Sequence, residues 1–116
     1  MGSGRKKYLK NLYLGRKAAA VREKVIRAVD RDAPFPDLYL ITFASNGTDQ
    51  LDILEARYLS DDRISNSLPE IVGLAIGRNE AFETVRRMAA DTYRDTGACD
   101  MVSYLKQMDE SPSGNR

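Results

Sequence analysis

LYLITFA, at residues 38–44, is a run in which almost every residue is β-branched, aromatic or large and aliphatic. Pro34 and Pro36 precede it, and the turn-forming sequence SNGT follows at residues 45–48. The run has no regular polar alternation, which is typical of a strand that is covered on both faces. We therefore expect residues 38–44 to form the central strand of a sheet.

A second strand and a long helix are expected in the C-terminal half. Residues 70–76 form another apolar run, and residues 80–96 carry apolar side chains at helical spacing. Asn79 is a candidate N-cap for this helix and Gly97 a candidate terminator. A short third strand is expected over residues 101–105, and residues 109–116 have the composition of a disordered tail.

Residues 49–59 fit two structures. The sequence Asn46-Gly47 is a strong signal for a hairpin, which would make the next segment a strand. The spacing of Leu51, Leu54 and Tyr58 fits a helix, with acidic residues in its first turn. We expect the helix and keep the strand as the alternative. The polar residues 60–69 are expected to form a mobile connection.

The N-terminal part is expected to be helical and basic. Leu9, Leu12 and Tyr13 would share one face of a helical turn. Residues 16–30 predict a helix, because apolar side chains recur at spacings of three and four. Lys17, Lys24, Arg27 and Arg31 fall on a different stripe from those apolar residues. This basic stripe would be available to a partner outside the helix's own core.

Alternating strands and helices favour an α/β fold. We expect a small parallel β-α-β core of two to three strands with two packed helices, preceded by a basic N-terminal helix. The expected organisation is a basic arm over residues 1–33, an α/β domain over 34–108 and a disordered tail over 109–116.

The chain has 116 residues and a formal net charge of +1, but its charges are segregated. Up to Arg31 there are ten basic and two acidic residues, and from Asp32 onward there are eight basic and fifteen acidic. Such asymmetry indicates a polyanionic partner, or a basic helix that lies on its own acidic domain. A single cysteine, no signal peptide and no membrane-length apolar run favour a cytoplasmic protein without a membrane partner.

The residues for common catalytic chemistry are missing from the sequence. Histidine is absent, and Cys99, the single cysteine, is expected to be an unreactive, partly buried thiol. Residues 73–77 (GLAIG) match neither a Walker loop nor a dinucleotide fingerprint. The acidic pairs at 49 and 52 and at 61 and 62 are better explained as helix caps and a solvated loop than as metal ligands. We therefore expect a non-enzymatic protein with no cofactor and no metal site.

Two loops are candidates for a joint anion site. In a parallel β-α-β unit the loops that follow both strands lie at the same edge of the sheet, beside two helix N-termini. Their residues could hold a phosphate or carboxylate, or could simply be turn and cap residues. These residues are Ser45, Asn46, Gly47, Thr48, Gly77, Arg78 and Asn79.

Three parts of the sequence carry a resemblance: residues 38–46 (LYLITFASN), the following QLDI at 50–53, and IVGLAIG at 71–77 before a Glu-Ala helix. They resemble uncharacterised small proteins of integrative mobile elements of Gram-positive gut bacteria, over residues 37–105. The resemblance implies an accessory or regulatory role and brings no catalytic residues with it.

The leading hypothesis is an accessory protein whose basic N-terminal helix binds nucleic acid or an acidic protein. Basic side chains neutralise phosphates, and Tyr8 and Tyr13 would stack on unpaired bases. The alternatives are a sensor of small anions that uses the two loops, and a homo-oligomer formed through a sheet edge or the face of Leu9, Leu12 and Tyr13. The candidate polyanion-binding residues are Arg5, Lys6, Lys7, Lys10, Arg16, Lys17, Lys24, Arg27 and Arg31.

Overall fold

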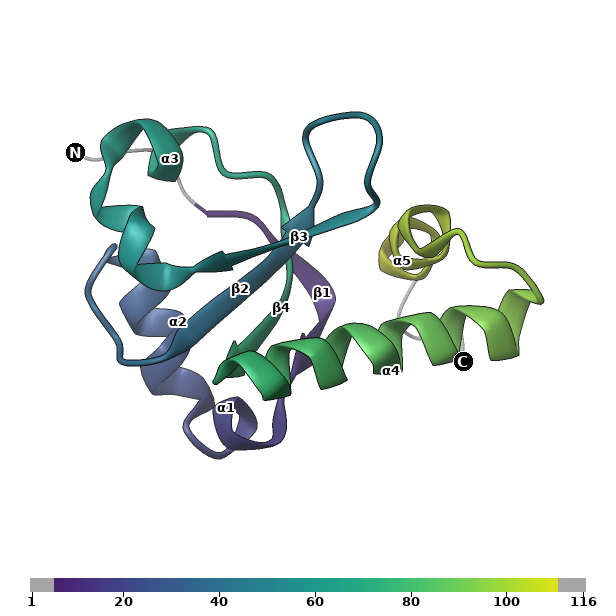
Figure 1. The fold of residues 1–116 in the computed structure, drawn as a ribbon, viewed down its shortest axis with the longest axis horizontal. Helices are drawn as coiled ribbons and strands as arrows, with labels where there is room; N and C mark the ends of the chain where they lie inside the picture. The colour runs from purple at the N-terminus through teal and green to yellow at the C-terminus, as the bar shows by residue number, and fades with distance from the viewer. Residues whose placement is uncertain (1–5, 111–116) are drawn as a thin grey trace.

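The structure, a computed structural model, describes residues 6–110. They form a four-stranded mixed sheet with the strand order β1-β4-β2-β3 (Figure 1). The strands are β1 (Tyr8–Leu14), β2 (Leu38–Phe43), β3 (Leu51–Glu55) and β4 (Ile71–Ile76). β1 pairs in parallel with β4, whereas β2 runs antiparallel to both β4 and β3.

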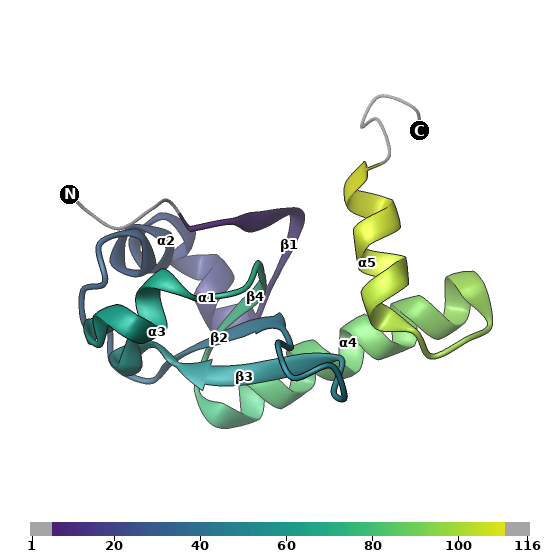
Figure 2. The ribbon, with the colours of Figure 1, turned by 90° about the horizontal axis from the view of Figure 1, so that it is seen from above.

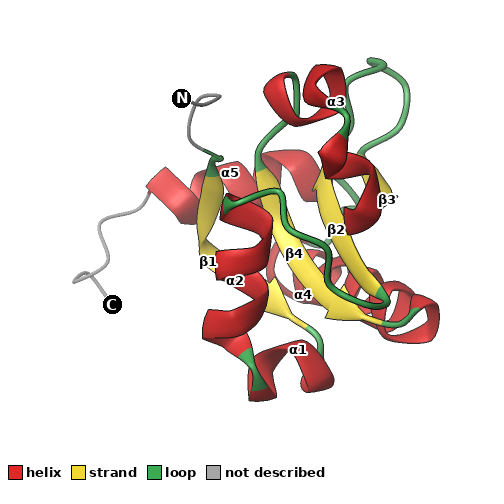
Figure 3. Ribbon diagram, turned by 90° about the vertical axis from the view of Figure 1, so that its left-hand side faces the viewer, coloured by secondary structure: helices red, strands yellow, loops and turns green. Residues whose placement is uncertain are grey.

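The helices cover both faces of this sheet (Figures 2 and 3). α1 (Arg16–Ala20), α2 (Arg22–Asp30), the 3-10 helix η1 (Ala56–Ser60) and α3 (Asp62–Asn66) lie on one face, while α4 (Arg78–Thr96) and α5 (Met101–Glu110) lie on the other. None of the helices between residues 6 and 110 is long and apolar enough to span a membrane.

Alternating side chains of β2 pack into two separate hydrophobic cores, one on each face of the sheet. Leu38 and Leu40 point into the core beneath α1 and α2, whereas Ile41 and Phe43 point into the core beneath α4 and α5. Four of the six residues of β2 are less than 3 % exposed, and the other two, Tyr39 and Phe43, are more exposed than these four. The prediction of a strand buried on both faces is therefore confirmed.

The predictions of a strand over residues 70–76 and of a helix over residues 80–96 are also confirmed, as β4 and α4. α4 ends at Gly97, which adopts a left-handed conformation (φ 74°) and donates its N–H to the carbonyl of Tyr93 at 2.8 Å. The start of α4 differs from the prediction, because Gly77 and not Asn79 occupies the N-cap position.

The prediction of a parallel β-α-β core was wrong, because the segment after β2 is a strand and not a helix. β2 and β3 form a hairpin with five consecutive residue pairs, from Tyr39 with Glu55 to Phe43 with Leu51. Gly47 lies in the connecting loop with φ 77°, a conformation that glycine adopts at little cost. The Asn-Gly hairpin signal therefore gave the correct structure, and the helical spacing of the leucines did not.

The prediction of one basic N-terminal helix was wrong, because the segment forms a strand followed by two short helices. Residues 8–14 form β1, an edge strand that shares the sheet with the rest of the chain. The predicted helix over residues 16–30 is divided into α1 and α2 at Val21, whose backbone (φ −127°, ψ 39°) is not helical.

Three further expectations were wrong. Residues 101–105 belong to α5 instead of a strand, and α5 also includes Asp109 and Glu110 of the expected tail, whose residues 111–116 lie outside the described range. Residues 60–69 contain α3 and the end of η1 instead of an irregular connection.

The buried position of β2 generates a stability prediction. We expect Leu40→Ala to lower the free energy of unfolding by about 2–5 kcal/mol, because Leu40 is fully buried and its truncation leaves a cavity. Phe82→Ala is the control, since Phe82 is 50 % exposed on α4 and should change stability far less. Chemical denaturation of both variants measures the difference, and equal losses would contradict the assignment of the core.

Candidate polyanion interface

Six exposed basic side chains lie on α1, on α2 or at Arg31, the residue directly after α2. We call this set the basic face; its residues are Arg16, Lys17, Arg22, Lys24, Arg27 and Arg31. All six are exposed, and none of them forms a salt bridge within residues 6–110. The opposite side of the same helices is buried through Ala18, Val25, Ala28 and Val29. Packing on the sheet therefore directs the cations to solvent.

Part of the predicted basic stripe survives on α2. Lys24, Arg27 and Arg31 are spaced by three and four residues and therefore lie on one side of the helix. Lys17 belongs to α1 and is separated from this row by the break at Val21. Arg22 is exposed at the start of α2 and was missed, because its position does not fit the stripe of a continuous helix from residue 16 to 30.

Lys6 was predicted to bind a polyanion, but its side chain forms a salt bridge within the protein. Its Nζ atom lies 2.7 Å from Oδ1 of Asp32, and its side chain is only 4 % exposed. The hydroxyl of Ser65 donates to the same oxygen at 2.9 Å. Asp32 has a left-handed backbone (φ 52°) that aspartate tolerates better than most residues. This cluster joins the start of the described chain to the end of α2 and to α3.

The two tyrosines predicted to stack on bases also form hydrogen bonds within the protein. Tyr8 donates its hydroxyl to Asp30 at 2.5 Å, and Tyr13 donates to Asp91 at 2.6 Å. Burial raises the pKa of both phenols well above the usual value, and the hydrogen-bonded carboxylates raise it further. Both rings pack against the cores of the protein and are not displayed with the cations.

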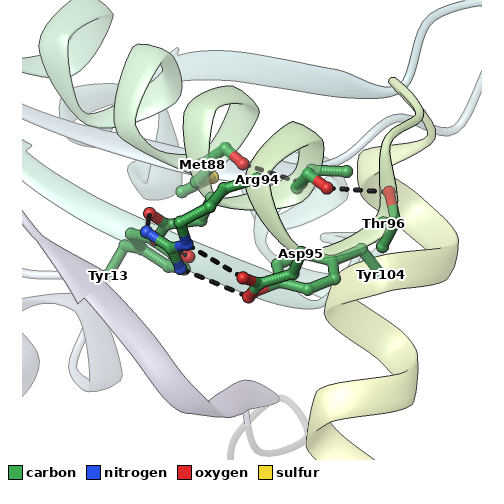
Figure 4. A network of polar contacts seen from close by, with 8 residues as sticks. Tyr13, Met88, Arg94, Asp95, Thr96 and Tyr104 are labelled. Carbon is green, nitrogen blue, oxygen red and sulfur yellow. Dashed lines mark hydrogen bonds and ion pairs between the residues drawn. The ribbon is translucent and has the colours of Figure 1, made fainter.

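Tyr13 belongs to a network that joins β1, α4 and α5 (Figure 4). Arg94 contacts Asp91 at 3.1 Å and Asp95 at 2.8 Å, and Tyr104 of α5 donates its hydroxyl to Asp95. Burial, followed by the hydrogen bond to Asp95, raises the pKa of Tyr104 to about 12. The network holds α5 against the rest of the fold, which is a structural role.

The remaining predicted cations are not carried by the two helices. Lys7 is exposed just before β1, and Lys10 is exposed within β1, where its backbone N–H donates to Asp109 of α5 at 2.5 Å. Arg5 lies outside the described residues. Six of the eight exposed cations between residues 6 and 31 therefore belong to the basic face.

The two candidate anion loops do not meet. β2 and β4 are antiparallel, so residues 45–48 lie at the end of the sheet where β4 begins, and residues 77–79 lie at the opposite end. The first loop is also internally bonded, since Oδ1 of Asn46 accepts the N–H groups of Thr48 and Asp49, both at 2.9 Å. The sequence placed these loops together only because it predicted a parallel sheet.

A carboxylate of the protein itself occupies the N-terminus of α1. Oε1 of Glu80 accepts the N–H of Lys17 at 2.8 Å, and Oε2 accepts those of Ala18 at 3.2 Å and Ile76 at 2.9 Å. Burial raises the pKa of this carboxyl, but the three backbone donors and nearby Lys17 outweigh burial and hold the pKa below its ordinary value of 4.5. Glu80 thus fixes α1, and with it part of the basic face, to the sheet.

Two observations concern other chemistry. Within residues 6–110 there is no group of three or more histidine, cysteine, aspartate or glutamate side chains that could hold a metal ion. Cys99 is exposed, so the expectation of a partly buried thiol was wrong.

No protein-family model, curated protein or solved structure matches this chain. The resemblance to proteins of mobile elements therefore stays a prediction.

The geometry of Glu80 predicts a pH-dependent contribution to stability. Because the folded pKa lies below the unfolded value, the contribution is present above about pH 4.5 and is lost as the pH falls through the folded pKa. We expect Glu80→Gln to lower the free energy of unfolding by about 1–3 kcal/mol near pH 7, since hydrogen bonds to a charged acceptor are weakened. Urea denaturation between about pH 7 and pH 3 should show the two proteins converging at acid pH.

Glu83→Gln is the matched control, because Glu83 is exposed on the same helix and forms only a surface pair with Arg86 at 2.9 Å. We expect it to follow the parent protein at every pH. A constant difference between Glu80→Gln and the parent down to acid pH would contradict the role of the Glu80 charge.

Proposed function

We propose that this protein is a non-enzymatic accessory or regulatory protein that binds the phosphate backbone of nucleic acid through its basic face. The supporting observation is the set of six exposed cations on α1, on α2 and at Arg31, none of which has a salt-bridge partner within residues 6–110. Unpaired cations on one surface release the counterions of a polyanion when they bind it, which is the main source of sequence-independent affinity.

The spacing of the cations suits a repeating row of phosphates. Lys24 and Arg31 are seven residues apart, which corresponds to about 10 Å along a helix axis. That length of duplex DNA carries about three phosphates per strand. Because Tyr8 and Tyr13 are bonded inside the fold, base stacking by these residues is not part of the proposal, and contacts to a duplex backbone take its place.

An acidic protein is the alternative partner for the same face. The homo-oligomer hypothesis is supported less well, because Leu9, Leu12 and Tyr13 pack against the protein's own cores. We do not propose a small-anion sensor built from both loops, because the two loops lie at opposite ends of the sheet. The accessory role also agrees with the resemblance to proteins of mobile elements, and we propose a cytoplasmic location because the chain carries a single cysteine.

Replacement of the row on α2 should weaken binding of duplex DNA. We expect the variant Lys24→Gln, Arg27→Gln, Arg31→Gln to lower the magnitude of the slope of log K against log [salt] by about 2–3, since each phosphate contact contributes about 0.9. The measurement is a fluorescence anisotropy titration of a labelled duplex at several salt concentrations.

The control variant is Arg63→Gln, Arg86→Gln, Lys106→Gln, which removes the same total charge from exposed positions on α3, α4 and α5. It should retain most of the slope. Equal losses in the two variants would leave only net charge as the cause and would overturn the basic face as the binding surface. Binding of poly-glutamate without binding of DNA would favour the acidic protein partner.

A further inference from the structure

The outer edge of β3 has backbone groups that no other strand of the sheet covers. Among the described residues, β3 is the last strand in the sheet and pairs only with β2. The N–H of Ala44 donates to the carbonyl of Gln50 at 3.0 Å, which fixes the alternation of this antiparallel ladder. By that alternation, the N–H and C=O groups of Leu51, Ile53 and Glu55 point away from β2. Figure 1 shows β3 at the edge of the sheet, and within residues 6–110 no further strand pairs with these three residues.

The opposite edge of the sheet is protected in ways that β3 is not. The pairing of β1 with β4 shifts register between Tyr8 and Tyr13, and α5 packs beside β1 and accepts the N–H of Lys10 with Asp109. β3 has a regular register and contains neither proline nor lysine, the residues that commonly block edge pairing. Ile53 is 37 % exposed in the middle of this edge.

The charge around β3 indicates which partner fits. Residues 32–56 contain five carboxylates and no lysine or arginine. Lys6 neutralises Asp32, and Arg57 lies 2.6 Å from Glu55, but Asp37 and Asp52 have no salt bridge within the described residues. A second copy would bring an equally acidic edge against this one, so like charges oppose self-pairing. A basic segment is favoured instead.

A hollow of about 520 Å³ continues the edge beyond Glu55. Phe35 and Tyr39 supply aromatic walls, and Asp37 supplies a carboxylate. A lysine or arginine side chain fits this composition, because its aliphatic stem can pack on the rings while its charged end meets the carboxylate. The hollow is also lined by Pro34, Pro36, Leu38, Glu55 and Arg57.

We infer that the outer edge of β3 binds an extended, lysine- or arginine-rich peptide segment by strand addition. The main chain of the segment pairs with Leu51, Ile53 and Glu55, and its basic side chains meet the carboxylates around the edge. This surface differs from the basic face in position and in the sign of its charge, so the inference does not rest on the proposed function.

A peptide titration followed by amide NMR tests the inference on the full chain. The probe is a capped peptide of three Lys-Val repeats. We expect shifts and slowed hydrogen exchange at the amides of Leu51, Ile53 and Glu55, with little further slowing at Asp52 and Leu54, which already bond to β2. A Glu-Val peptide of equal length should not bind, because of the acidic edge.

Backbone N-methylation of alternate residues in the Lys-Val peptide separates strand addition from charge attraction. The methylated peptide keeps its charge and side chains but loses the N–H donors that pair with the edge. We therefore expect its affinity to be lower by a factor of about ten or more. Equal binding of the methylated peptide would overturn strand addition.

Variants of the protein provide the second arm. Asp52→Lys should weaken binding of the Lys-Val peptide by about tenfold, whereas Asp62→Lys, with the same charge change on exposed α3, should change it less. Amide spectra of both variants establish that each is folded. Two results would overturn the inference: no shifts at the edge, or protection of the same three amides without peptide together with a dimer in sedimentation.

Discussion

The carboxylate of Glu80 joins the start of α1 to the junction of β4 and α4, which lies 62–63 residues further along the chain. It lies in the first turn of α4, and it accepts backbone N–H groups from Lys17 and Ala18 at the start of α1 and from Ile76 at the end of β4. A side chain at Gly15 could not coexist with this arrangement, since a Cβ atom there would lie 2.2 Å from the Glu80 carboxylate. The position of α1 on the sheet thus depends on one charged acceptor and one glycine.

This constraint has consequences for the surface. α1 and α2 bury small and β-branched residues against the sheet, so their charged residues must face solvent. The N–H groups of Lys17 and Ala18 at the start of α1 already bond to Glu80, which places a carboxylate where an external anion would otherwise bind. In the proposed binding, cationic side chains, and not a helix N-terminus, therefore supply the attraction for phosphates. The proposed binding is diffuse and dependent on salt for the same reason.

The sequence was sufficient where an element is strongly and continuously apolar or has clear ends. β2 and β4 are buried apolar runs, and α4 combines a wide apolar stripe with a terminating glycine. It was insufficient for β3, whose leucines fit both a helix and a strand; the pairing with β2 decided between them. β1 was missed because its one lysine, its tyrosines and its leucines resemble a basic amphipathic helix, and its place at the edge of the sheet comes only from the pairing with β4.

The candidate site was predicted in part for a related reason. Exposure of Lys24, Arg27 and Arg31 follows from the buried stripe of α2, which is local in sequence. The internal roles of Lys6, Tyr8 and Tyr13 depend on Asp32, Asp30 and Asp91, which are 26, 22 and 78 residues away. No local pattern reveals such partners, so these residues looked available when they were not.

The separation of charge along the sequence becomes a separation in space through the topology of the sheet. The basic residues that precede Asp32 are carried mainly by helices on one face, and the stretch without cations, residues 32–56, includes the β2–β3 hairpin at one edge. α5 covers the other edge, at β1, and Asp109 bonds to Lys10 there. Within residues 6–110, a helix thus covers one edge of the sheet, whereas the other edge is regular and pairs with no further strand. Because opposite charges select different partners, the nucleic acid proposed for the basic face and the basic peptide proposed for the edge of β3 would not compete for one surface.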